Sequence, residues 1–277
     1  MAEDLLIAKG IEVTYGGGGL LGGVGHKVLH GVDLSIKRGE TIGIVGESGS
    51  GKTTFGRALL RLVDVSAGEI RFDGVDITHS PDHRMRPLRR RMQMIFQDPM
   101  ASLNPRHSIR RILVGPLLFH GVASDARDAE ARVVRMLDRF TLPKIVLDRN
   151  PHELSGGQRQ RVGIARAALL EPDFVLADEI VSGLDVSTQA QVLNLLKDLS
   201  RDLGLAMAFI SHDLSVIRAV CDRVCVMRFG KVVEEGPCEQ VFAAPKSNYT
   251  RALLDAIPLP EIDPEWLERE ALVDETQ

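Results

Sequence analysis

An apolar segment, a glycine-rich turn and a helical pattern follow one another directly near the start of the chain. Thr41–Val45 is an apolar run of strand length, and the next eight residues read GESGSGKT, a complete G-x-x-x-x-G-K-T sequence. Lys52–Val63 then carries apolar residues at helical spacing. A strand that turns through such a loop into a helix points backbone N–H groups and the positive helix end at an anion. The segment therefore predicts an α/β core with a phosphate-binding loop.

The residue types of this loop predict how a nucleoside triphosphate is held. Lys52 would bind the β- and γ-phosphates as a point charge, and the Thr53 hydroxyl would be a ligand of Mg²⁺. A glycine-rich turn without a ligand is the alternative, and the flanking strand and helix disfavour it. The predicted ATP-binding residues of the loop are Gly46, Ser48, Gly49, Ser50, Gly51, Lys52, Thr53 and Thr54.

Two further motifs follow the loop along the chain. One is the run Leu154–Gln158, which reads LSGGQ, and the other is the apolar strand Phe174–Ala177, which ends in Asp178 and Glu179. An acidic pair after a strand is commonly a solvated turn, but its position after a phosphate loop favours a catalytic role. Asp178 would hold Mg²⁺, and Glu179 would polarise the attacking water, a general-base role worth about 10²- to 10⁴-fold in rate.

Seven such pieces, in this order, resemble the nucleotide-binding subunit of ABC transporters, and the match covers nearly the whole chain. The resemblance implies an ATP hydrolase with an α/β fold, a P-loop NTPase core of ABC type with an antiparallel β portion and an inserted helical subdomain. The pieces are Tyr15, Gly46–Thr53, Gln97, Leu154–Gln158, Asp178-Glu179, Ser182–Asp185 and His212.

The same resemblance implies roles for single residues. Tyr15 would stack on adenine, although packing is an equal explanation for one tyrosine, and His212 would contact the γ-phosphate. The catalytic residues are then Glu179, His212 and Gln97, and the Mg²⁺ ligands are Thr53, Gln97 and Asp178. The remaining nucleotide-binding residues are Ser155, Gly156, Gly157, Gln158 and Asp185.

The LSGGQ run implies that one subunit is an incomplete machine. In the family this signature lies away from its own phosphate loop and closes on ATP held by a second subunit. Ser155 and the glycine N–H groups would meet the γ-phosphate near a helix N-terminus. Two subunits arranged head to tail would enclose two ATP molecules, and Asp185 would help the two sites to sense each other.

The chain of 277 residues is predicted to fall into four parts, and no internal repeat is visible. Gly16–Gly25 is predicted to be a flexible loop, and Ser124 to be the N-cap of a helix. One helix is predicted to carry an apolar face of Val192, Leu195, Leu199 and Leu203. The four parts are a nucleotide-binding portion (1–96), a helical subdomain with the signature (97–157), a second core portion (158–235) and a C-terminal tail (236–277).

Composition limits the classes of function. The formal net charge of −4 argues against a general nucleic-acid binder, and the basic run Arg84–Arg91 is interpreted as a solvated helix face. The apolar stretches are shorter than the roughly 20 residues that span a bilayer, and Gly115 and Pro116 interrupt one of them. Any membrane role must then come from partners. The three cysteines lack metal-site spacing and are interpreted as small apolar or surface residues.

The residues after Glu179 depart from the common family pattern. Ile180 and Val181 stand where proline and threonine are usual, and Gly183 stands where alanine is frequent. Loss of a fixed-φ residue and gain of a permissive glycine are expected to alter loop stiffness and turnover more than the chemistry.

A narrower resemblance concerns the transported solute. Met94–Pro99, Ala101–Arg106 and the tail segment Asn248–Leu254 are similar to the ATPase subunits of oligopeptide and dipeptide ABC importers, a branch that also handles nickel and opine-like compounds. This resemblance implies two membrane-spanning permease subunits, a second and different ATPase chain, and an extracytoplasmic solute-binding protein, at the cytoplasmic face of a bacterial inner membrane. The alternative is a soluble ABC-type ATPase in a metabolic complex, such as phosphonate degradation.

Overall fold

The computed structural model describes residues 3–16 and 25–256. Apart from its two ends, the predicted flexible loop Gly16–Gly25 lies outside the described residues, and so does the end of the predicted tail. The chain divides into two compact units. The first unit comprises Met1–Met85 and Gly204–Asp263, and the second comprises Arg86–Leu203 and Pro264–Gln277.

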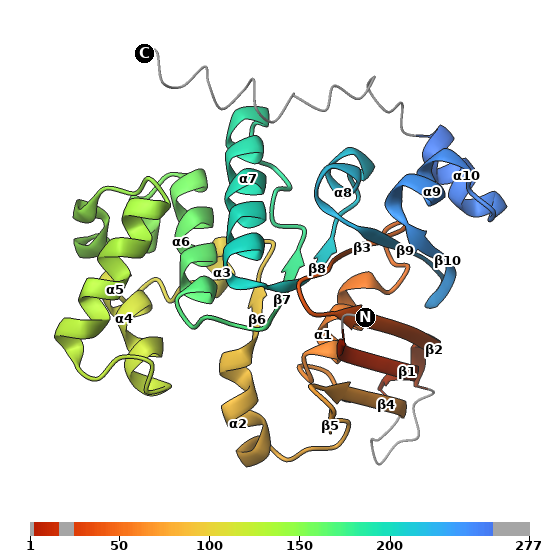
Figure 1. Cartoon of the computed structure of the whole chain (residues 1–277), viewed down its shortest axis with the longest axis horizontal. Helices are drawn as coiled ribbons and strands as arrows, with labels where there is room; N and C mark the ends of the chain where they lie inside the picture. The colour runs from red at the N-terminus through yellow and green to blue at the C-terminus, as the bar shows by residue number, and fades with distance from the viewer. Residues whose placement is uncertain (1–2, 17–24, 257–277) are drawn as a thin grey trace. The chain divides into compact units, whose positions relative to one another are not determined.

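The first unit carries most of the strands (Figure 1). Its strands are β1 (Asp4–Tyr15), β2 (His26–Lys37), β3 (Thr41–Val45), β4 (Ala67–Phe72), β5 (Val75–Asp76), β8 (Ala206–Ile210), β9 (Arg223–Arg228) and β10 (Lys231–Pro237). Its helices are α1 (Lys52–Leu59), α8 (Leu214–Val220), α9 (Cys238–Ala243) and α10 (Asn248–Asp255). Helix α2 (Asp82–Arg91) contains the boundary between the units.

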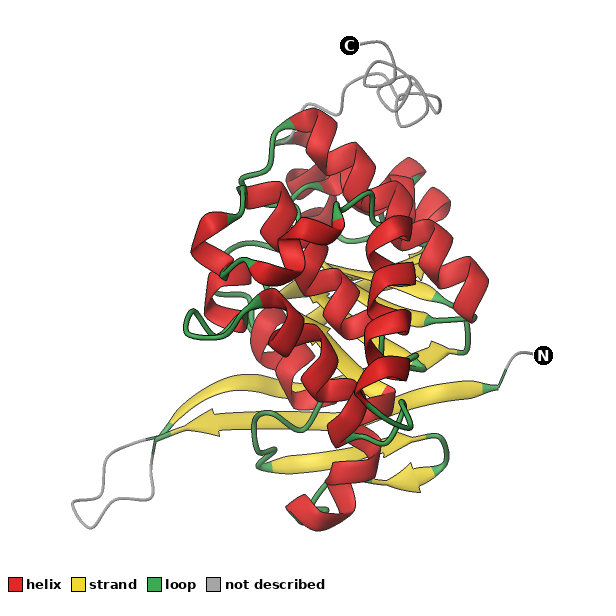
Figure 2. Cartoon of the chain, turned by 90° about the vertical axis from the view of Figure 1, so that its left-hand side faces the viewer, coloured by secondary structure: helices red, strands yellow, loops and turns green. Residues whose placement is uncertain are grey.

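Strands β1, β2, β4 and β5 form an antiparallel sheet in the order β2-β1-β4-β5. The long strands β1 and β2 run side by side (Figure 2), and their apolar residues alternate with polar ones. Alternation places one set of side chains on the buried face, where Ile11 of β1 lies opposite Val32 of β2. This sheet is the antiparallel β portion that the family resemblance implies.

Strand β3 is the centre of a second, largely parallel group in the first unit. It pairs in parallel with β8 on one side and with β9 on the other, and β10 pairs antiparallel with β9. All five residues of β3 and of β8 are buried, because a strand covered on both faces is apolar throughout. The predicted strand Thr41–Val45 is confirmed.

The second unit holds the parallel strand pair β6 and β7 and most of the helices. The strands are β6 (Met92–Ile95) and β7 (Phe174–Asp178). The helices are α3 (Pro99–Ser102), α4 (Ile109–Phe119), α5 (Ala126–Arg139), α6 (Gly156–Ala168) and α7 (Val186–Leu203), and two 3₁₀ turns cover Lys144–Asp148 and Pro151–Glu153.

Helices α4 and α5 pack against each other through buried aliphatic side chains (Figure 1). Leu113 and Leu117 of α4 and Val133 and Leu137 of α5 are fully buried. Pro116 lies inside α4, and the helix continues past it to Phe119. The helix is therefore continuous through Gly115 and Pro116, although these residues interrupt the apolar run.

Two local helix predictions need correction. The N-cap of α5 is Asp125, whose carboxylate accepts the Asp128 N–H at 2.8 Å, whereas Ser124 precedes the cap. On α7 the buried face includes Leu193 and Leu196, and Leu203 is exposed at the C-terminal end. Periodicity located both helices, but it did not choose between neighbouring residues of the same type.

The basic run of α2 is only partly a solvated face. Arg84 is exposed, but Arg91 forms an ion pair with Asp173, and Arg90 Nε donates to the Leu170 carbonyl at 3.3 Å. The Arg86 guanidinium lies 4.6 Å from the centre of the Phe119 ring. These contacts attach the C-terminal part of α2 to α4 and to the segment between α6 and β7.

The three cysteines all belong to the first unit, and all three are buried. Burial raises the pKa of the Cys225 thiol far above its usual range and raises the pKa of Cys238 to about 12. They are small apolar residues of the core, and the surface alternative is wrong.

Two further properties concern the described residues as a set. None of the helices within them has the length and apolar character needed to cross a bilayer. Within the same residues, His, Cys, Asp and Glu side chains do not gather into a group of three that could hold a metal ion.

Candidate functional site

The phosphate loop is a tight turn whose first glycine has no room for a side chain. Gly46 follows β3 with φ of 147°, and a Cβ added there would lie 2.1 Å from the carbonyl oxygen of Met227. The side chain of Lys52, only 6 % exposed, turns back over the loop. Its ammonium donates to the carbonyl oxygens of Gly46 at 2.7 Å and Glu47 at 2.8 Å. The chain thus holds Lys52 at the mouth of its own loop.

Two distant parts of the first unit also hold the loop. The N–H of Gly230, which follows β9, donates to the carbonyl of Ser50 at 3.0 Å. The N–H of Glu47 donates to the hydroxyl of Tyr249 on α10 at 3.1 Å, across 202 residues of sequence. Neither Glu47 nor Tyr249 is among the predicted site residues, because no local pattern links them.

Helix α1 begins directly after the loop, with its positive end toward the loop. Its N-cap is Gly51, with φ of 100° and no side-chain hydrogen bond to the first turn. Ser48 and Gly49 are exposed, whereas Ser50 is buried. A concave run of backbone N–H groups at a helix start is the arrangement that binds phosphate.

Tyr15 and His212 lie at the ends of strands in the first unit. Tyr15 is the last residue of β1, and 44 % of it is exposed, so its ring faces solvent and is not packed in the core. His212 is exposed and follows β8, between the buried Ser211 and Asp213. Asp213 caps α8 by accepting the Ser215 N–H at 2.9 Å, which fixes the backbone around the histidine.

The second unit brings together the predicted catalytic glutamate and Gln97. Asp178 ends β7 and is 3 % exposed, and Glu179 follows in a left-handed conformation with φ of 48°. A non-glycine residue in this region carries strain, and such residues gather at functional sites. The Gln97 amide, beyond the end of β6, donates to a Glu179 carboxylate oxygen at 3.0 Å.

The residues that depart from the family pattern form the turn after Glu179. Ile180 and Val181 are both buried, and the Ser182 N–H donates to the Glu179 carbonyl at 3.1 Å. Gly183 has φ of 77°, a conformation that favours glycine over alanine. The apolar pair therefore anchors this turn, and the glycine suits its backbone.

The Asp185 carboxylate accepts several hydrogen bonds at the start of α7. It accepts the Thr188 N–H at 2.9 Å, the Ser187 hydroxyl at 2.7 Å and the Thr188 hydroxyl at 2.8 Å. The backbone N–H of Thr188, followed by the two hydroxyl groups, lowers the pKa of Asp185 to about 2. This carboxylate is exposed and stays ionised through the neutral range.

The signature run forms the start of α6. Ser155 is the N-cap, and its hydroxyl accepts the Gln158 N–H at 3.3 Å while the Gln158 side chain accepts the Ser155 N–H at 3.1 Å. This reciprocal capping box holds the turn with its own residues. Ser155 and Gly156 are exposed, and Gly157 faces Thr188 of α7, whose methyl carbon would lie 3.0 Å from an added Cβ.

Similarity to known proteins identifies the family of this chain. The sequence profile of the ABC transporter family matches residues 29–182, more than half of the chain. The chain belongs to the ABC transporter family. The fold class and the ATPase activity expected from the sequence are those of its ATP-binding cassettes.

Curated relatives of this ABC ATPase include import proteins. A putative peptide import ATP-binding protein of Brucella ovis is 54 % identical over 237 residues, which cover 86 % of this chain and 74 % of the relative. The oligopeptide transport ATP-binding protein OppF of Bacillus subtilis is 47 % identical over 239 residues, covering 86 % of this chain and 78 % of OppF.

The fold of this ABC ATPase is similar to those of solved ATP-binding cassettes, one of which contains bound nucleotide. A dimeric ATP-binding cassette in a post-hydrolysis state, bound to ADP and Pi, superposes with a TM-score of 0.76 at 30 % identity. The superposition covers 84 % of this chain and 98 % of that cassette.

Proposed function

We propose that this ABC ATPase is the ATP-binding and ATP-hydrolysing subunit of an importer for peptides or a related small solute. The observation that carries the proposal is the 54 % identity, over 86 % of the chain, with a relative named for peptide import. The OppF relative carries a transport name as well. These names favour an importer over a soluble metabolic complex such as phosphonate degradation.

In this proposal the first unit binds the triphosphate. Lys52, oriented by its two loop carbonyl acceptors, offers its ammonium to the phosphate oxygens, which are strong partners because they are charged. The N–H groups of Gly49–Thr54 surround the phosphates, Tyr15 stacks on adenine, and His212 contacts the γ-phosphate. The exposed ring of Tyr15 supports its role, since base–aromatic stacking needs an accessible face.

The proposed Mg²⁺ ligands are Thr53, Gln97 and Asp178. Their hydroxyl, amide and carboxylate oxygens are the hard donors that Mg²⁺ prefers, and Asp178 is buried at the end of its strand, so these residues fit the ion. Bound Mg²⁺ supplies positive charge that neutralises the β- and γ-phosphates.

Glu179 is the proposed residue that polarises the attacking water. The amide of Gln97 donates to one carboxylate oxygen at 3.0 Å, which supports this role because it fixes the direction of the group that is to accept a proton from water. The strained backbone at Glu179 also supports this role, because the turn that it begins is fixed by the buried Ile180 and Val181.

Replacement of Glu179 by Gln tests the catalytic part of the proposal. The amide keeps the shape but loses the charge, so hydrolysis should slow by about 10²- to 10⁴-fold while ATP still binds. Glu171→Gln, the same change at an exposed glutamate of the same unit, is the matched control and should hydrolyse ATP normally. Normal turnover of Glu179→Gln in the assembled complex would place the base elsewhere.

The signature motif is proposed to act on ATP held by a second ATPase subunit, with Asp185 communicating between the two sites. A mixture of Lys52→Ala and Ser155→Arg copies distinguishes two assemblies. In a homodimer one site pairs an intact loop with an intact signature, so mixing restores hydrolysis. We expect a heterodimer with a different ATPase chain, in which mixing these two variants alone gives no rescue, and strong restoration would contradict that expectation.

The remaining proposed partners are two transmembrane permease subunits and an extracytoplasmic solute-binding protein, at the cytoplasmic face of a bacterial inner membrane. One of the four proposed parts is the helical subdomain, residues 97–157. It is expected to bind a helix of a permease subunit. Purification of the native complex, with identification of its chains and of any bound solute, tests the assembly. Cross-linking that finds no membrane subunit near residues 97–154 would remove the transport-specific part of the proposal.

A further inference from the structure

The peptide that joins Gly46 to Glu47 is held at both of its polar ends. Its carbonyl oxygen, on Gly46, accepts a hydrogen bond from the Lys52 ammonium at 2.7 Å. Its N–H, on Glu47, donates to the Tyr249 hydroxyl at 3.1 Å. A peptide is planar, so these two groups cannot turn independently of each other. The Tyr249 hydroxyl therefore constrains the same plane that holds the ammonium of Lys52.

Tyr249 is itself fixed in place. Its side chain is largely buried, and the Arg228 guanidinium lies 4.6 Å from the centre of its ring. A cation over an aromatic face restrains the ring as well as attracting it. Ser247 caps α10 by accepting the Tyr249 N–H at 3.2 Å. The hydroxyl consequently reaches Glu47 from a ring whose position is already determined.

Helix α10 is anchored to β10 at its first turn. The Glu234 carboxylate accepts the N–H of Lys246 at 2.8 Å and the N–H of Ser247 at 3.0 Å. Partial burial acts to raise the pKa of Glu234, but hydrogen bonds from the Lys246 N–H, the Thr250 hydroxyl and the Ser247 N–H outweigh it, and the pKa lies below its usual range. The anchor is therefore ionised and intact at neutral pH.

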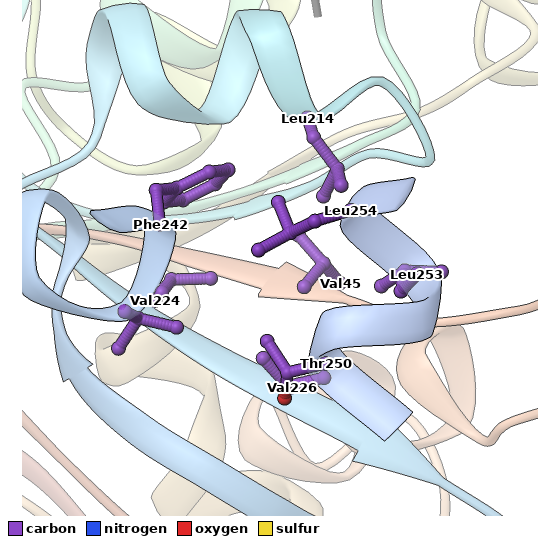
Figure 3. A pocket seen from close by; sticks show the side chains of 9 residues that line it. Val45, Leu214, Val224, Val226, Phe242, Thr250, Leu253 and Leu254 are labelled. Atoms are coloured by element: carbon purple, nitrogen blue, oxygen red, sulfur yellow. The ribbon is translucent and has the colours of Figure 1, made fainter. Parts of the chain in front are cut away.

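Apolar side chains of α10 pack on the core of the first unit. Figure 3 shows Leu253 and Leu254 beside Leu214 of α8 and Phe242 of α9, with Val45 of β3 beneath. The cavity that remains among them is about 10 Å³, close to the room that one water molecule needs. Val45 directly precedes Gly46, so α10 and the phosphate loop share one packed base.

We propose that Tyr249 is a positioning residue, which orients Lys52 through the Gly46–Glu47 peptide and thereby sets the affinity of the phosphate loop for ATP. The inference rests on the proposed role of that loop. Tyr249 does not bind the nucleotide in this account, and it acts through the backbone. Helix α10 is thus a functional part of the ATP site as well as a C-terminal brace.

Tyr249→Phe tests the proposal because it removes the hydroxyl and keeps the ring over Arg228. The dissociation constant for ATP should rise about three- to ten-fold, the loss expected for one neutral hydrogen bond, while kcat of the assembled complex stays unchanged. Asp255→Asn, a polar change at an exposed residue of the same helix, is the control and should leave ATP affinity unchanged. Unchanged affinity in Tyr249→Phe would overturn the proposal.

A double-mutant cycle separates positioning from a general loss of stability. If Tyr249 acts through Lys52, Tyr249→Phe should cost little further affinity in a Lys52→Ala background. Full additivity of the two effects would contradict the inference. If Lys52→Ala alone binds ATP normally, the proposed role of the loop fails instead, so the two failures are distinguishable.

Amide hydrogen exchange gives a measurement that needs no nucleotide. Exchange in the segment 46–50 should be faster in Tyr249→Phe than in the unmodified chain, because the Glu47 N–H loses its acceptor. Asp255→Asn should exchange at the normal rate in the same segment. Equal exchange in all three proteins would contradict the inference, even if the thermal stability of Tyr249→Phe were lower.

Discussion

The phosphate loop and the signature turn both contain glycine near the start of a helix, but the two turns are held differently. Gly46 of the loop is pressed against the Met227 carbonyl, and the loop is held by Lys52 and by the hydroxyl of Tyr249. In the signature turn, Ser155 is tied to its own neighbour Gln158. Within the described residues, a Cβ added to Gly156 would meet no atom within 4 Å.

This difference separates two reasons for a glycine. Position 46 needs glycine because its own chain leaves no space for a side chain and requires a left-handed backbone. The fold of the chain places no such demand on Gly156. In the proposed dimer, an approach by the ATP of a second subunit would account for glycine at position 156.

The largest effect is expected for Lys52→Ala. An ammonium that balances the triphosphate is lost, so hydrolysis by the assembled complex should fall on the order of 10²- to 10³-fold. Lys9→Ala, at an exposed lysine of β1, is the matched control. Hydrolysis that survives in Lys52→Ala would show that the loop is held in shape for some purpose other than binding phosphate.

A pair of alanine substitutions tests the comparison itself. Gly46→Ala should lower the free energy of unfolding by about 3 kcal/mol, since the new methyl group meets the Met227 carbonyl in a strained backbone. Gly156→Ala should leave the free energy of unfolding unchanged or raise it by up to about 1 kcal/mol, because alanine favours a helix. Urea unfolding measures both. Equal destabilisation would remove the distinction between the two turns.

A smaller effect is expected for the cap of the signature helix. Ser155→Ala removes the acceptor of the Gln158 N–H and should cost about 1 kcal/mol of unfolding free energy. Ser155→Asn keeps a capping oxygen, so urea unfolding should find its stability near that of the unmodified chain. If Ser155→Ala costs nothing, the capping box does not stabilise this turn.

The smallest effect is expected in the dependence of stability on acidic pH. The folded-state pKa of Asp185, about 2, is below the usual 3.8, so its stabilising effect is present above about pH 4 and is lost as pH falls toward 2. Asp185→Asn should therefore make the urea midpoint less dependent on pH in that window. Asp138→Asn, at an exposed aspartate, is the control. An unaltered pH dependence in Asp185→Asn would contradict the assigned hydrogen bonds.

The sequence was sufficient for the features that depend on short stretches of chain. The buried strands Thr41–Val45 and Phe174–Asp178 follow from continuous apolar runs, and the loop between β3 and α1 follows from its glycines and Lys52. The family resemblance assigned Gln97 and Glu179 to one catalytic set, and the structure adds the hydrogen bond between them. Each of these signals is contained in a few adjacent residues or in the order of the motifs.

The features that were missed depend on the packed chain. Asp125 caps α5 in place of Ser124 because the side chain that reaches the first turn is set by where the helix begins, and neighbouring capping residues look alike in sequence. The contact of Tyr249 with Glu47 joins positions 202 residues apart. The tail could be compared with a family, but only the fold shows which hydroxyl reaches the loop.

Because all three cysteines are buried, the native thiols of the folded chain should react only slowly with thiol reagents. Maleimides attack the thiolate, and the raised pKa of Cys225 and Cys238 keeps these sulfurs protonated as well as covered. A single cysteine introduced on the exposed surface of the second unit can then carry a fluorophore without removal of the native ones. The native thiols all lie in the first unit. The rate at which they are slowly labelled would therefore measure the opening of that unit alone.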